Sequence, residues 1–276
     1  EKLSEKAAQL AMKTEEKPVS FVEDCAVNLE DLADYTNDLK SIFKKYKVNG
    51  TWYAHASVGC LHVRPVLNMK LKEDVSKMRN IAEEASILIK KYNGSFSGEH
   101  GDGIVRSEFI EVMFGRKINK IFKKIKNSFD PYNIFNPGKI IDSPKMDDRN
   151  YFRFSPGYEA KHVKTTLDWS EWTGKSSGFL GAVEMCNNNG ACRKLDNGVM
   201  CPSYRATLDE KDSTRGRANT LRLALTGQLG PEAITSEKMA DTMKLCVSCK
   251  ACKKECPTGV DMAKMKIEIA NLNNQK

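Results

Sequence analysis

The sequence lacks the long apolar run that marks a membrane-spanning helix, which needs about 18 consecutive apolar residues. It also lacks a signal peptide. The chain opens at Glu1 instead of a methionine, so we expect a fragment or a processed start. These absences predict a cytosolic protein, at most bound peripherally to the inner face of the membrane.

Concentrated positive charge is lacking too, although the net charge is +8. The lysines are interleaved with acidic residues along predicted helices, and no short block of lysine and arginine stands out. This distribution is typical of a solvated surface and not of a nucleic-acid groove. We therefore expect no nucleic-acid partner, whereas a positive field could attract an anionic substrate.

Few cysteines are left over for disulfide bonds. Of the nine cysteines, seven fall in two motifs, which leaves only Cys25 and Cys60. A disulfide framework is therefore excluded, and clustered thiolates fit a reducing compartment.

The first motif has the spacing C-x2-C-x2-C-x3-C followed by proline, and it comprises Cys246, Cys249, Cys252 and Cys256. This is the bacterial ferredoxin pattern for a 4Fe–4S cluster. A structural zinc site is the alternative, but zinc sites favour separated pairs of cysteines. The spacing thus predicts an electron-carrying protein.

The second motif repeats the first with Asn189 in place of its middle cysteine, between Cys186 and Cys192, and with Cys201-Pro202 at its end. In two-cluster ferredoxins the Cys-Pro of each motif ligates the cluster of the other. The complete cluster would then be held by Cys246, Cys249, Cys252 and Cys201. The second would be held by Cys186, Cys192 and Cys256, with Asn189 at the vacant corner.

Asparagine is a poor ligand for iron in such clusters. The second site is therefore predicted to hold a 3Fe–4S cluster, or a 4Fe–4S cluster with a non-protein ligand at its fourth iron. The alternative is a lost second cluster with leftover thiols.

Apolar periodicity predicts helices over residues 1–13, 74–92, 117–129 and 215–225, and a helix capped by Asn28 that reaches Tyr46. Short strands are predicted over residues 19–22, 51–54 and 61–64. The alternation lacks strict βαβ spacing, so an α+β fold is expected. We expect a first domain over residues 1–142, a linker over 143–178, and a mainly helical cysteine domain over 179–276.

A second constellation surrounds a tight turn that contains glycine. His55 and His62 flank the turn, and Glu99 and His100 lie in a polar, glycine-rich segment downstream. Two imidazoles and one carboxylate form an open catalytic metal set, with a free position for substrate. The alternative is that these histidines are ordinary hydrogen-bonded residues beside a hairpin.

Three segments together resemble the C-terminal domain of the FAD-linked oxidases of the vanillyl-alcohol oxidase superfamily. They are His55-x6-His62, Glu99-His100-Gly101, and Asp130-Pro131 followed by Asn136-Pro-Gly-Lys139. This family includes D-lactate and D-2-hydroxyglutarate dehydrogenases. The cysteine region, with Met200–Tyr204 and Ser213–Ala218, resembles large bacterial dehydrogenases that carry both FAD and iron–sulfur clusters.

The resemblance implies a role for each site residue. His55, His62 and Glu99 would bind a divalent metal such as zinc, which would hold the carboxylate and hydroxyl of a 2-hydroxy acid. His100 would be the base for the hydroxyl proton, and Arg64 would help to orient the substrate carboxylate. The cofactor-binding residues implied are Asn136, Gly138 and Lys139. Ser57-Val-Gly-Cys60 stands where the family often has Gly-Asp-Gly-Asn, which leaves substrate identity and metal occupancy open.

The resemblance also predicts the partners. The sequence shows no glycine-rich pyrophosphate loop, so an FAD-binding domain or subunit would supply the flavin. The predicted function is oxidation of a D-2-hydroxy acid, of the lactate or 2-hydroxyglutarate type, to the 2-oxo acid. Electrons would pass from flavin to the clusters and then to a quinone, cytochrome or flavoprotein. The alternatives are a non-catalytic iron–sulfur electron-transfer subunit and, less consistent with the motifs, a zinc-stapled nucleic-acid-binding protein.

Overall fold

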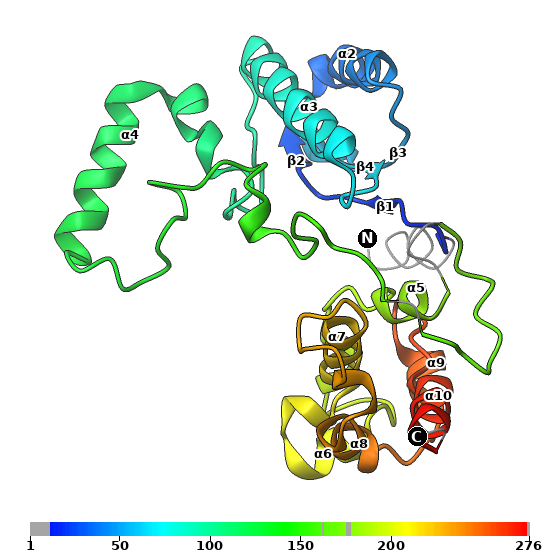
Figure 1. Ribbon diagram of the computed structural model, residues 1–276. Coiled ribbons are helices and arrows are strands. Elements are labelled where there is room, and N and C mark those ends of the chain that lie inside the picture. Colours follow the sequence, from blue (N-terminus) through cyan, green and yellow to red (C-terminus); the bar gives the residue numbers. More distant parts are fainter. Residues whose placement is uncertain (1–11, 162, 175–177, 275–276) are drawn as a thin grey trace. The chain divides into compact units, whose positions relative to one another are not determined.

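The computed structural model describes residues 12–161, 163–174 and 178–274 (Figure 1). These residues form two compact units, Glu16–Pro156 and Gly157–Lys276, and the described residues before Glu16 join the second unit. The predicted helix over residues 1–13 lies outside the described residues except for Met12 and Lys13, which are not helical. Among the described helices, none combines the length and apolarity needed to cross a bilayer.

The first unit is built on an antiparallel sheet. Its strands are β1 (Lys17–Pro18), β2 (Val22–Ala26), β3 (Gly50–His55) and β4 (Cys60–Leu67). Strand β4 is central, because β1, β2 and β3 all pair with it. The predicted strands over 51–54 and 61–64 are confirmed, whereas the strand predicted over 19–22 lies mostly between β1 and β2.

Helices α2 (Leu32–Lys45) and α3 (Lys72–Lys91) pack with the sheet around one hydrophobic core. The inward face of α2 contributes Tyr35, Leu39 and Phe43, at the spacing that periodicity predicts. Burial of side chains of this size stabilises the fold by about 1.5–3 kcal/mol each. The predicted Asn28 cap is wrong: the helix is entered through a 3-10 turn at Leu29–Asp31, and the Asn28 side chain makes no capping hydrogen bond.

Gly59 closes the turn between β3 and β4 in the left-handed conformation, at φ 66°. A Cβ atom there would lie 2.0 Å from the backbone oxygen of Val27. We expect Gly59→Ala to lower the free energy of unfolding by about 3 kcal/mol or more, measured by denaturant titration. Gly103→Ala is the matched control, because φ there is 56° but a Cβ would meet no described atom within 4 Å. Its cost should be the backbone strain alone, about 1–2 kcal/mol, and equal losses would contradict the steric argument.

Helix α4 (Ile110–Phe129) extends from this unit with its apolar side chains exposed (Figure 1). The predicted helix over 117–129 is confirmed, but the chain is already helical from Ile110, with a break at Gly115. Asp130 ends the helix by accepting the backbone N–H groups of Ile134 and Phe135, both at 2.9 Å. The exposed apolar side chains include Ile118, Ile121, Ile125, Phe129, Tyr132, Ile134 and Phe135.

The second unit consists of short helices in its described part. These are α5 (Phe179–Glu184), α6 (Pro202–Thr207), α7 (Thr214–Leu225), α8 (Glu237–Lys244), α9 (Ala251–Glu255) and α10 (Met262–Asn274). Of the further 3-10 turns, Ala56–Val58, Ser107–Phe109 and Arg149–Tyr151 lie in the first unit, and Ala191–Arg193, Glu210–Asp212 and Ala233–Thr235 lie in the second. Helix α7 is capped by Ser213, whose hydroxyl accepts the Gly216 N–H at 2.9 Å. The α+β fold class is confirmed by a helix-and-sheet unit followed by a helical one.

Candidate functional sites

Strand pairing places Glu23, His62 and Tyr53 in one row across the sheet of the first unit. His62 on β4 pairs with Tyr53 on β3 and with Glu23 on β2. Side chains alternate along a strand, so Cys60, His62 and Arg64 share the face that this row defines. His62 is fully buried in this row, and its ring stacks on Tyr53 with centroids 4.9 Å apart.

A bulge in β2 brings the downstream segment to this face. The pairing register shifts between Glu23 and Cys25, and Asp24 between them has φ 74°. The Asp24 carboxylate accepts the N–H of Glu99 at 2.9 Å and the N–H of His100 at 2.7 Å. Burial would raise the pKa of Asp24, but these amide hydrogen bonds outweigh it and lower that pKa below its usual value. An ionised Asp24 therefore fixes the position of the Glu99-His100 segment.

Glu99 lies between the histidines that the sequence singles out. Its Oε1 atom is 3.3 Å from Nε2 of His55 and 3.3 Å from Nε2 of His62. Donor atoms about 2.0–2.1 Å from a tetrahedral zinc ion stand about 3.3 Å from one another. The donor types and these two distances match a divalent metal such as zinc, but His55 lies outside the group of described side chains whose ligand atoms all approach within 4.8 Å of one another.

The position of His100 allows a second ligand set. Its Nε2 atom is 3.5 Å from the same oxygen of Glu99, and its ring stacks on His62 with centroids 5.0 Å apart. Among the described residues, Asp24, His62, Glu99 and His100 each offer a ligand atom, all within 4.8 Å of one another. Ligation by His55, His62 and Glu99, with His100 left as a base, stays a prediction.

Sequence reasoning missed Glu23 and Asp24 as site residues. Glu23 is buried, and its carboxylate accepts from Arg64 through Nε at 3.3 Å and Nη2 at 3.2 Å. Arg64, predicted to orient the substrate, thus directs two of its nitrogens to Glu23. Cys60 lies 3.9 Å from Nε2 of His62, and burial together with Asp24 raises the pKa of its thiol to about 12. Cys60 is therefore a protonated thiol beside the site when no metal is bound, and it donates to the Asp24 carboxylate at 3.3 Å.

The predicted cofactor-binding residues lie after α4. Asn136 and Gly138 have positive φ angles of 48° and 73°, and Lys139 donates to the Asn136 side chain at 3.4 Å. Asn136 and Lys139 are exposed. Their contact with FAD stays a prediction.

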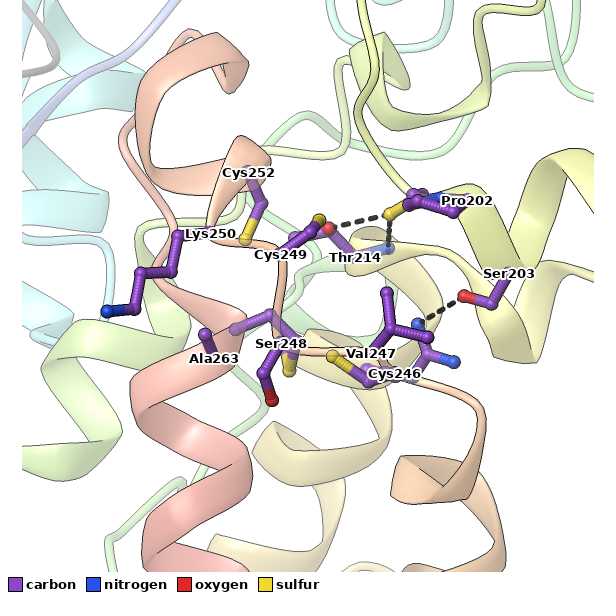
Figure 2. A pocket seen from close by; sticks show the side chains of 13 residues that line it. Pro202, Ser203, Thr214, Cys246, Val247, Ser248, Cys249, Lys250, Cys252 and Ala263 are labelled. Atoms are coloured by element: carbon purple, nitrogen blue, oxygen red, sulfur yellow. Dashed lines mark hydrogen bonds between the residues drawn. The ribbon is translucent and has the colours of Figure 1, made fainter.

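The second unit brings four cysteines around one pocket, namely Cys201, Cys246, Cys249 and Cys252. These are the four residues that the crossed Cys-Pro rule assigns to the complete cluster. Figure 2 shows Cys246, Cys249 and Cys252 around the pocket, with Thr214 facing it from α7. Four thiol groups on one pocket fit a 4Fe–4S cluster.

The N-terminus of α7 reaches two cysteines of the second motif, which the crossed rule assigns to different clusters. The Thr214 N–H donates to Sγ of Cys201 at 3.0 Å, and its hydroxyl lies 2.9 Å from the same sulfur. The next N–H, of Arg215, donates to Sγ of Cys192 at 3.4 Å. Burial raises the pKa of the Cys201 thiol to about 11, so a cationic ligand is needed to ionise it near neutral pH.

The ligand set predicted for the second cluster comprises Cys186, Cys192 and Cys256. Cys186 and Cys192 are buried, and Cys256 is half-buried with Sγ 3.4 Å from the Thr258 hydroxyl. The Asn189 side-chain oxygen accepts the N–H of Ala191 at 2.8 Å, so it holds its own loop. Membership of Cys256 in this set stays a prediction.

Comparisons with known proteins match both units of the chain. The family model of the FAD linked oxidases, C-terminal domain, matches residues 2–140, and that of the 4Fe-4S dicluster domain matches residues 182–260. The D-2-hydroxyglutarate dehydrogenase of Pseudomonas putida is 32% identical over 90% of this chain and 27% of its own length. That of Escherichia coli is 29% identical over 93% of this chain and 28% of its own length. The D-lactate dehydrogenase of Archaeoglobus fulgidus is 29% identical over 45% of this chain and 27% of its own length. The chain thus spans about a quarter of the length of these relatives.

Proposed function

Since the chain belongs to the FAD-linked oxidases and carries a 4Fe-4S dicluster domain, we propose that it is the C-terminal portion of a D-2-hydroxy acid dehydrogenase. The substrate is of the 2-hydroxyglutarate or lactate type, and the product is the 2-oxo acid. The observation that carries this proposal is the convergence of His55 and His62 on one oxygen of Glu99, with His100 beside it. The names of the relatives support the class of substrate.

In the proposed reaction His55, His62 and Glu99 hold the metal, and the substrate hydroxyl is presented to His100. When bound, the metal supplies a Lewis acid that lowers the pKa of the hydroxyl, and the flavin supplies the hydride acceptor. His100 takes the hydroxyl proton, as imidazole can near neutral pH. Its backbone N–H donates to the Asp24 carboxylate at 2.7 Å, and this hydrogen bond restrains the position of the ring.

Cys201, Cys246, Cys249 and Cys252 would hold the complete cluster. Cys186, Cys192 and Cys256 would hold the second, as 3Fe–4S or as 4Fe–4S with a non-protein ligand. Bound there, the clusters would supply single-electron transfer to a quinone, cytochrome or flavoprotein. Asn136, Gly138 and Lys139 would contact FAD held by a separate flavin-binding domain or subunit.

The proposal is tested by joining the chain to a flavin-binding domain from its reading frame or its genomic neighbour. Dye reduction by D-2-hydroxy acids, absent with L-enantiomers, is the expected result. Cluster EPR signals without metal at His55, His62 and Glu99, and without substrate affinity, would instead show a non-catalytic electron-transfer subunit.

Thr214 is expected to tune the complete cluster. Thr214→Val removes the hydroxyl 2.9 Å from Sγ of Cys201 and keeps the shape of the side chain. A hydrogen bond to sulfur stabilises the more negative reduced cluster, so its loss should lower the midpoint potential. We expect about a tenfold change in the reduction constant, which is about 59 mV for one electron, measured by redox titration with EPR.

Thr258→Val is the matched control, because the Thr258 hydroxyl lies 3.4 Å from Sγ of Cys256. It should shift the potential of the second cluster and leave the first unchanged. A shift of the same cluster by both variants would contradict the assignment of Cys201 and Cys256 to different clusters.

A further inference from the structure

We infer that Glu23 is a positioning residue for the metal centre: it holds His62 in the tautomer whose Nε2 lone pair faces Glu99. Arg64 in turn donates two hydrogen bonds to the Glu23 carboxylate and holds it in place. The inference rests on the proposed function, because it concerns the metal that this site binds. It explains why Glu23, which is not among the predicted metal ligands, is buried beside His62.

The tautomer follows from hydrogen-bond chemistry. Oε1 of Glu23 lies 3.2 Å from Nδ1 of His62, and the Glu23 side chain is only 7% exposed. A carboxylate without a proton only accepts hydrogen bonds, so when a metal occupies Nε2 the proton of His62 sits on Nδ1 and is donated to Glu23. Nε2 then presents its lone pair toward Glu99 Oε1 at 3.3 Å. Two lone pairs that face each other at this distance repel, and a cation between them relieves that repulsion.

Arg64 accounts for the burial of a charged Glu23. A buried carboxylate is costly unless it is paired and hydrogen-bonded. Nε and Nη2 of Arg64 both donate to Glu23, and the Tyr53 hydroxyl adds a longer contact at 3.5 Å. The Arg64 side chain is itself only 10% exposed. Arg64 thus donates to Glu23, and Glu23 accepts from Nδ1 of His62. In metal sites a carboxylate in this position orients the histidine that binds the metal.

The role of Glu23 predicts a loss of metal affinity without loss of a ligand. The test uses the full chain loaded with iron and sulfide, so that the cysteines do not take up zinc. Zinc affinity is measured by competition with a chromophoric chelator. We expect Glu23→Gln to bind zinc about 10- to 100-fold more weakly than the wild type, with the cluster spectrum unchanged. Glu30→Gln, at an exposed glutamate of the same unit, should bind zinc as the wild type does. Equal affinity for Glu23→Gln and the wild type would overturn the inference while leaving the proposed function intact.

A second measurement needs no variant and covers the case in which Glu23→Gln does not fold. The 15N chemical shifts of His62 in the zinc-loaded wild type report which ring nitrogen carries the proton. Nδ1–H with the metal on Nε2 is expected, and an Nε2–H form would overturn the role of Glu23. Failure of the wild type to bind zinc would instead reject the metal centre of the proposed function.

Discussion

Cys201→Ala is expected to abolish the EPR signal of the 4Fe–4S cluster that Cys246, Cys249 and Cys252 hold, although Cys201 belongs to the other motif. These four cysteines line one pocket, so Cys201 would supply the fourth thiolate. Without that thiolate the cluster is either lost completely or loses one iron and becomes a 3Fe–4S cluster. Electron delivery to the external acceptor should then fall to background, while flavin reduction by the substrate persists. Iron and sulfide analysis with low-temperature EPR is the measurement.

Cys256→Ala supplies the decisive comparison. It should leave the signal of the complete cluster intact and remove the second cluster. Cys25→Ala is the matched control, because this buried thiol donates to the Phe96 carbonyl oxygen at 3.7 Å and lies outside both motifs. If Cys256→Ala removes the complete cluster and Cys201→Ala does not, each motif keeps its own Cys-Pro and the crossed assignment is wrong.

Local patterns in the sequence predict what is local in the structure. The inward face of α2 follows from apolar residues at helical spacing, and the end of α3 follows from Asn93-Gly94, where Asn93 has φ 50°. The cysteine spacing predicts a set that the fold gathers on one pocket. The helix face and the helix end are determined by residues close in sequence, and the cysteine set is determined by a motif whose spacing is specific to iron–sulfur clusters.

Strand register and bulges are not visible in such patterns. Glu23 and His62 become partners only because β2 pairs with β4 in one register, and a shift by one residue would turn Glu23 to the other face. Asp24 reaches the amides of Glu99 and His100 only through its bulge. Nor does Asn28 reveal that a 3-10 turn precedes α2 and leaves Leu29 exposed. Long-range pairing decides these features, and one sequence carries no direct record of it.

His100→Ala is expected to lower the turnover number about 100- to 10,000-fold, the usual contribution of a general base. The enzyme tested is the chain joined to its flavin-binding domain, assayed by dye reduction with saturating substrate. The reason is geometric: Nε2 of His100 lies 3.5 Å from Glu99 Oε1, beside the proposed metal, and the side chain is 37% exposed, so substrate can reach it. Zinc content and cluster EPR should match those of the wild type, because His100 is not in the proposed ligand set.

His55→Ala separates the two ligand sets that the geometry allows. If His55, His62 and Glu99 hold the metal, His55→Ala loses both zinc and turnover, whereas His100→Ala loses turnover alone. If zinc is lost in His100→Ala and kept in His55→Ala, the metal is held by the group that contains Asp24, His62, Glu99 and His100. The proton would then need another acceptor, and His55, whose Nε2 atom is 3.3 Å from Glu99, is the nearest imidazole left for that role. Unchanged turnover in His100→Ala would remove His100 from the reaction altogether.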